Sequence, residues 1–283
     1  MMQTTINRSV CCQGIDITGK AIVNMQLAPA EINSGIVFVR NDLPGNPQVR
    51  CNANNCLVES RWTSLQENGV RVDHTEHILA TIAGLGIDNI IIRLDNPSIP
   101  VVDGYSCKDF TEKILSAGIK ELSAPKKYFQ VKSPCLIVDQ FYSGGQRYEK
   151  FIAALPADNL ELIYILEYPD GSLPGQMAQY SIVPEVFINQ LADARSYITA
   201  GEYQQVAKLI GKGMDSVLVF SPGKLVGLRW PNEPARHKLV DLLGDLSTVG
   251  CPLKGKFIAF RSGHQLNNQL IKKITKNWEE GNR

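Results

Sequence analysis

Residues 77–84 read HILATIAG and residues 237–244 read HKLVDLLG, and the two stretches share the frame His-x-Leu-x-x-aliphatic-x-Gly. Their apolar residues recur at the three- and four-residue spacing of an amphipathic helix. In each case an aliphatic strand candidate follows. Two similar helix–strand units, one in each half of the chain, suggest a duplicated domain whose copies each offer one histidine from the start of a helix. If the copies pack face to face, the two histidines can meet.

The segments around these frames alternate between strand and helix signals. Alternating or continuous apolar runs predict strands at 21–27, 36–40, 87–94, 161–168, 217–220 and 256–260. Helical spacing predicts helices at 75–84, 109–117, 184–194, 202–210, 233–246 and from 267 onward. The stretch 123–134 mixes prolines with charge between these periodic segments. We therefore predict an N-terminal domain at 1–125 and a C-terminal domain at 128–283.

Composition excludes several classes of protein. The 29 Lys and Arg residues nearly balance 28 Asp and Glu residues, so a broad surface for nonspecific nucleic-acid binding is not expected. No stretch approaches the ~18 apolar residues of a membrane span, and the first residues lack the apolar core of a secretion signal. Seven cysteines without a CxxC pair favour buried thiols in a reducing compartment over disulfides or a cysteine-rich zinc site. We expect a cytoplasmic protein without stable membrane insertion.

The chain has four histidines, a residue type that binds metals and transfers protons near neutral pH: His74, His77, His237 and His264. His237 and Asp241 are spaced i,i+4, so on a helix they lie on one face and can grip one metal ion. Asp245 lies one turn further along that face. A salt-bridged surface stripe is the alternative interpretation, because Arg236 and Lys238 are charged neighbours.

A catalytic zinc ion usually takes three protein ligands and one water, so two ligands leave such a site unfinished. The pair Glu76-His77 can supply the third ligand. Adjacent helical positions point about 100° apart, so one residue can bind the metal while the other acts as general base. A rival interpretation uses His74 and His77 in HTEH, which is one residue short of the H-x-x-E-H zinc-peptidase motif. His264 could reach the site from a loop before the last helix.

Four stretches, taken together, resemble the zinc-dependent UDP-3-O-acyl-N-acetylglucosamine deacetylase family, which commits its substrate to lipid A synthesis in Gram-negative bacteria. They are TEHILATIAGLGIDNI (75–90), IPVVDGYS (99–106), RHKLVDLLGDL (236–246) and SGHQLNN (262–268). The resemblance covers nearly the whole chain. It implies an α+β fold of two related domains, each a β-sheet layered with helices, with the active site at the domain interface. It also implies a Zn²⁺ cofactor, a UDP-linked acylated amino sugar as substrate, acetate as product, and a monomer.

The metal ligands follow from the same resemblance. His77, His237 and Asp241 match the three zinc ligands of the family. His74 matches no family ligand, because the family commonly has a small polar residue at that position.

The resemblance also implies the remaining catalytic roles. Glu76 matches the general base that takes a proton from the attacking water, and His264 matches the protonated group that serves the leaving amine. Lys238 and Asp245 match residues that support the water and orient that histidine.

The stretch DARSYITAGEY departs from the family, which generally has threonine and then phenylalanine where this chain has Ser196 and Tyr197. Serine keeps the hydroxyl that helps polarise the substrate carbonyl but lacks the methyl group that stiffens threonine. In the family, this region forms an apolar passage for the fatty acyl chain, and here it is shorter. The residues expected to bind substrate along it are Tyr197, Ile198, Val206, Leu209 and Ile210.

Two alternatives remain open from the sequence. The shortened passage allows a zinc-dependent deacetylase that acts on a different N-acyl sugar or amide. A binding protein that keeps zinc without catalysis is the alternative from another functional class.

Overall fold

The computed structural model describes residues 1–59, 61–210, 217–220 and 227–281. The N-terminal half contains a five-stranded sheet, and its neighbours are antiparallel except for the parallel pair β9–β4. In spatial order its strands are β2 (Val10–Ile15), β3 (Ile22–Pro29), β9 (Ile90–Leu94), β4 (Ile36–Arg40) and β5 (Gln48–Arg50). The helices α1 (Glu76–Gly84) and α2 (Lys108–Ala117) come before and after β9.

The C-terminal half repeats this plan. Its strands follow the spatial order β12 (Cys135–Ser143), β13 (Gln146–Leu155), β18 (Leu253–Phe260), β14 (Leu160–Leu166) and β15 (Gln176–Ser181). Along this path only the β18–β14 pair is parallel. Here α5 (Glu233–Leu246) and α6 (His264–Gly281) come before and after β18.

The two halves therefore share one topology. In each, the last strand of the main sheet enters its middle, with one helix before it and one after it. The repeated His-x-Leu-x-x-aliphatic-x-Gly frame falls on the equivalent helices α1 and α5. The α+β fold with two related halves is confirmed.

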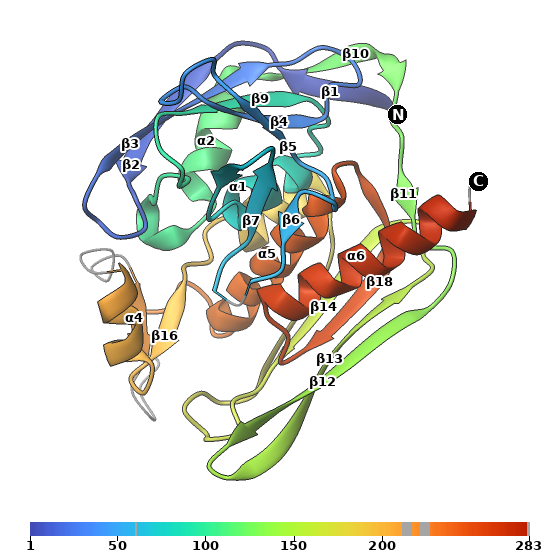
Figure 1. Ribbon diagram of the computed structural model, residues 1–283. Coiled ribbons are helices and arrows are strands. Elements are labelled where there is room, and N and C mark those ends of the chain that lie inside the picture. The colour runs from blue at the N-terminus through green and yellow to red at the C-terminus, as the bar shows by residue number, and fades with distance from the viewer. Residues whose placement is uncertain (60, 211–216, 221–226, 282–283) are drawn as a thin grey trace.

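The equivalent helices α1 and α5 pack against each other between the two sheets (Figure 1). Their close approach depends on Gly244, while Gly84 leaves room for a side chain outside both helices. A Cβ atom on Gly244 would lie 2.0 Å from the carbonyl oxygen of Glu76, and a Cβ on Gly84 would lie 2.3 Å from the Phe187 ring. Because α5 continues past Gly244 to Leu246, this glycine serves helix packing and does not end the helix.

We predict that Gly244→Ala destabilises the fold by about 2–3 kcal/mol, because the new methyl group meets the rigid backbone of Glu76. Urea unfolding followed by circular dichroism measures the change. Gly263→Ala is the matched control, since a Cβ there meets nothing within 4 Å. Equal stability of the two variants would contradict the packing role of Gly244.

Each half carries an insertion at the same point of the repeat, directly before the helix with the repeated frame. In the N-terminal half it is a three-stranded sheet of β6 (Cys56–Leu57), β7 (Ser64–Glu67) and β8 (Val70–Val72). In the C-terminal half it contains α3 (Pro184–Val186), the parallel strands β16 (Tyr197–Thr199) and β17 (Leu218–Phe220), and α4 (Tyr203–Ile210). Both insertions therefore lead into the N-terminal ends of α1 and α5.

Two segments differ from the helices expected from the sequence. Instead of one helix over 184–194, α3 is followed by a π-helix at Phe187–Leu191. The Phe187 ring packs against Gly84, a tertiary contact that helical periodicity does not encode. The last helix begins at His264, so this histidine opens a helix and does not sit in a preceding loop.

The predicted linker contains short strands. β10 (Ile119–Pro125) pairs with β1 (Met2–Ile6), whereas β11 (Phe129–Gln130) pairs with β18. The chain thus crosses from one half to the other between Pro125 and Phe129. The domain limits 1–125 and 128–283 stay a prediction.

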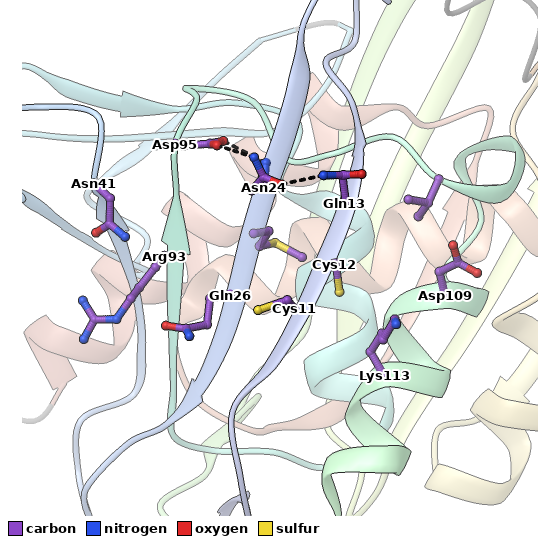
Figure 2. Close-up of a pocket in the computed structure, with 12 residues that line it drawn as sticks. Cys11, Cys12, Gln13, Asn24, Gln26, Asn41, Arg93, Asp95, Asp109 and Lys113 are labelled. Atoms are coloured by element: carbon purple, nitrogen blue, oxygen red, sulfur yellow. Dashed lines mark hydrogen bonds between the residues drawn. The ribbon is translucent and has the colours of Figure 1, made fainter.

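A hollow of about 690 Å³ lies at the N-terminal sheet, and none of the four histidines lines it. Figure 2 shows Cys11, Gln26 and Arg93 there, on the neighbouring strands β2, β3 and β9. Cys11 is exposed and Cys12 is buried, as expected for successive residues of a strand. All seven cysteines lie in the described ranges and are free thiols.

Among the described residues, no helix combines the length and hydropathy that a membrane span requires.

Candidate active site and metal centre

Three residues predicted as metal ligands converge where α1 meets α5. His77 Nε2 lies 3.2 Å from Asp241 Oδ1, and His237 Nε2 lies 3.4 Å from the same oxygen. All three side chains are buried, and each can offer one ligand atom within 4.8 Å of the others. His237 and Asp241, spaced i,i+4, thus both face inward, and the interpretation as a salt-bridged surface stripe is wrong for this pair.

This geometry suits a tetrahedral metal ion. Ligand atoms about 2.0–2.1 Å from a tetrahedral zinc are about 3.3 Å apart, which matches both separations from Asp241 Oδ1. His237 donates its Nδ1–H to the Ala194 carbonyl at 3.0 Å, which leaves the Nε2 lone pair for a metal. The residues present therefore fit a metal ion with three protein ligands.

Burial and nearby charges keep His237 neutral and Asp241 ionised, the protonation states in which the two side chains can bind a metal ion. Burial lowers the pKa of His237 to about 4, so its ring is neutral near pH 7. Burial opposes ionisation of Asp241, but the Lys238 ammonium and the neighbouring histidines outweigh it and hold the Asp241 pKa well below its usual range. Lys238 Nζ lies 2.9 Å from Asp241 Oδ2, and this contact outweighs burial and raises the pKa of Lys238.

Glu76 opens α1 beside the ligand cluster and is buried. Its Oε2 accepts a hydrogen bond of 2.9 Å from the backbone N–H of Thr63. Burial raises the pKa of Glu76 above its usual value, although His264 and His77 oppose that shift. A carboxylate with a raised pKa binds a proton more strongly, as a general base requires.

His264 and Asp245 form a second buried pair. His264 Nδ1 lies 3.0 Å from both carboxylate oxygens of Asp245, and its Nε2 lies 4.0 Å from Asp241 Oδ2. Burial alone would lower the pKa of His264, but the charge and hydrogen bonds of Asp245 raise it to about 9. Asn267 also donates to Asp245, at 2.8 Å. This arrangement can keep an imidazolium near the ligand cluster at neutral pH.

A single cavity of about 240 Å³ connects these groups with the residues predicted to bind substrate. The predicted residues that line it are Glu76, His77, Ser196, Tyr197, Ile198, Val206, His237, Lys238, Asp241 and His264. Asp245 is fully buried and is not among the lining residues, but it contacts the His264 ring, which lines the cavity.

Two of the residues expected to bind the acyl chain, Ile198 and Val206, line the cavity. Ile198 and Val206 pack with Val101 and Tyr105 in an apolar cluster separate from the main core. Leu209 and Ile210 end α4, and their side chains lie outside the described part of the structure.

Several residues at the cavity were not predicted from the sequence. Thr63 hydrogen-bonds both Glu76 and Asp245, and Trp62 and Tyr105 form part of the cavity wall. Tyr105 lies in the motif IPVVDGYS, so the resemblance in that stretch could have indicated it as a site residue. Trp62-Thr63 lies in no recognisable motif. His74, which the rival HTEH interpretation named as a ligand, also lines the cavity and forms a second candidate ligand group with Glu76 and His77.

The chain is similar to known proteins along almost its whole length. The family model described as UDP-3-O-acyl N-acetylglycosamine deacetylase (LpxC) matches residues 3–276. The UDP-3-O-acyl-N-acetylglucosamine deacetylase of Bdellovibrio bacteriovorus is 32% identical over 96% of this chain and 89% of its own length. The enzymes of that name from Lawsonia intracellularis and Histophilus somni are 35% and 33% identical, over 97% and 98% of this chain and 89% and 91% of their own lengths. With the family model and these relatives matched along almost their whole length, this chain belongs to the UDP-3-O-acyl-N-acetylglucosamine deacetylase family.

Proposed function

We propose that this chain is a zinc-dependent amide hydrolase that removes the acetyl group from UDP-3-O-[(3R)-3-hydroxyacyl]-N-acetylglucosamine and releases acetate, the committed step of lipid A biosynthesis. The observation that carries the proposal is the convergence of His77, His237 and Asp241 in one cavity with a buried carboxylate and a buried imidazole. The relatives named above carry the same activity in their names.

The three ligand residues would hold the zinc ion. An acetamide is a poor electrophile, and zinc, when bound, polarises its carbonyl and makes the attacking water more acidic. The neutral His237 ring and the ionised Asp241 suit this role without a change of protonation.

The residues around the ligands would handle the protons. Glu76 accepts a proton from the attacking water while the water oxygen forms a bond to the carbonyl carbon. The C–N bond then breaks, and His264 gives its Nε2 proton to the leaving amine nitrogen. Buried Asp245 holds the His264 ring through Nδ1, so Nε2 is the free donor. A carboxylate and an imidazolium at one pH supply both proton transfers.

Two further groups would stabilise the developing oxyanion. The Lys238 ammonium lines the cavity beside Asp241, and a fixed positive charge there lowers the barrier. Ser196 also lines the cavity and can donate its hydroxyl hydrogen to the carbonyl oxygen. Tyr197, Ile198 and Val206 border the same space, and we assign them, with Leu209 and Ile210, to the acyl-chain side.

The test is acetate release from the 3-hydroxyacylated UDP-N-acetylglucosamine. We expect turnover with one equivalent of zinc, a fall to below about 1% of that rate after chelation, and recovery when zinc is returned. UDP-N-acetylglucosamine without the acyl chain is the matched substrate control and should turn over more slowly. No release of acetate from the acylated substrate by the zinc-loaded protein would overturn the proposal.

A further inference from the structure

His74 adopts a backbone conformation that is uncommon outside glycine. Its φ is 64°, in the left-handed region, although it is not a glycine. The neighbours on both sides are held, since Asp73 O accepts from the Ile99 N–H at 3.1 Å and the Thr75 N–H donates to Thr63 O at 2.9 Å. Such strained residues persist where surrounding contacts hold them, and they cluster at functional sites.

The His74 ring is clamped between aromatic rings at the cavity wall. The Tyr105 ring lies 5.4 Å away at 81°, and the Trp62 ring lies 6.4 Å away at 86°, both edge-on. His74 itself is only 7% exposed. Its ring direction is therefore set by packing and not by solvent.

The clamped ring presents a nitrogen to the Glu76 carboxylate. His74 Nε2 lies 3.4 Å from Glu76 Oε1, while the Thr63 N–H donates to Oε2 at 2.9 Å. A lone pair on Nε2 would repel the carboxylate, so the hydrogen belongs on this nitrogen. A neutral ring and a protonated ring can both present that N–H. Burial lowers the pKa of His74 well below its usual value, and a cation bound at His77 would act in the same direction.

We propose that His74 is a positioning residue that fixes the orientation of the Glu76 carboxylate. The inference rests on the proposed role of Glu76 as general base. With Thr63 at one oxygen and His74 at the other, the plane of the carboxylate is held from two sides. Glu76 then faces the cavity in one orientation, so that its proton-accepting oxygen need not be oriented anew in each turnover.

The experiment compares zinc-loaded His74→Leu, His74→Asn and His74→Gln with the unmodified protein in the acetate-release assay. Leucine keeps bulk without a donor. Asparagine tolerates a left-handed φ but is too short to reach Glu76. The asparagine variant therefore still tests the proposal if the leucine variant fails to fold. Glutamine places an amide N–H near the position of His74 Nε2. Zinc content and circular dichroism are measured for each variant.

We expect kcat to fall about 10–100-fold in the leucine and asparagine variants, with KM within about twofold and zinc content unchanged. Glutamine should restore kcat to within about fivefold of the unmodified protein. Equal kcat in all four proteins would overturn the inference, as would equal losses in all three variants. Loss of zinc from the variants would instead make His74 a metal ligand. Absence of turnover in the unmodified protein would count against the proposed function itself.

Discussion

Glu76→Gln should lower kcat for acetate release by about 10²–10⁴-fold while zinc stays bound, because an amide cannot accept the proton of the attacking water. The two side chains have almost the same shape, so the carbonyl oxygen of glutamine can still accept the Thr63 N–H. Steady-state acetate release gives kcat and KM, and elemental analysis gives the zinc content.

The control for this variant is Glu149→Gln, an equally small change at an exposed position of β13. It should leave kcat and zinc content unchanged. Near-normal kcat in Glu76→Gln would remove Glu76 from the proton transfer. Loss of zinc in Glu76→Gln would favour the second ligand group, His74, Glu76 and His77, over the first.

Elements with strong periodicity were predicted closely from the sequence. The predicted helix 233–246 coincides with α5, the strand 36–40 with β4, and the helix 75–84 with α1 to within one residue. The shared frame in α1 and α5 also indicated two related halves, which the matching strand order confirms. These features depend on local spacing, which the sequence records directly.

The surroundings of the site could not be predicted in the same way. Thr63 donates its backbone N–H to the Glu76 carboxylate. Every residue except proline carries this group, so the residue type at position 63 does not predict the hydrogen bond. His74 lies beside Glu76 with a positive φ, and the backbones of its two neighbours bond to Ile99 and Thr63, contacts that its residue type does not reveal. The role of Gly244 was also hidden, since the sequence cannot show which helix backbone will lie against it.

His264→Gln should lower kcat by about 10²–10⁴-fold and abolish the basic limb of the pH–rate profile, because glutamine cannot supply the proton for the leaving amine. In the folded protein, Asp245 outweighs burial and raises the pKa of His264 to about 9, from an ordinary value of 6.5. The imidazolium therefore persists through neutral pH and is lost as the pH rises through the folded pKa. A bound dication repels it, so the basic limb of the unmodified protein should fall at or below about pH 9.

Asp245→Asn separates the acid role from a merely structural one. An amide at this position removes the negative charge that offsets burial, so the His264 pKa should fall and the basic limb should move to lower pH. The raised His264 pKa of the unmodified protein also affects its stability. A raised folded pKa contributes stability that is complete below pH 6.5 and disappears as the pH rises through about 9, so the unmodified protein should lose more stability than His264→Gln over that interval. Profiles of kcat/KM and urea midpoints from pH 6 to 10 measure both effects. An unchanged basic limb in His264→Gln would assign that ionisation, and with it the acid, to another group.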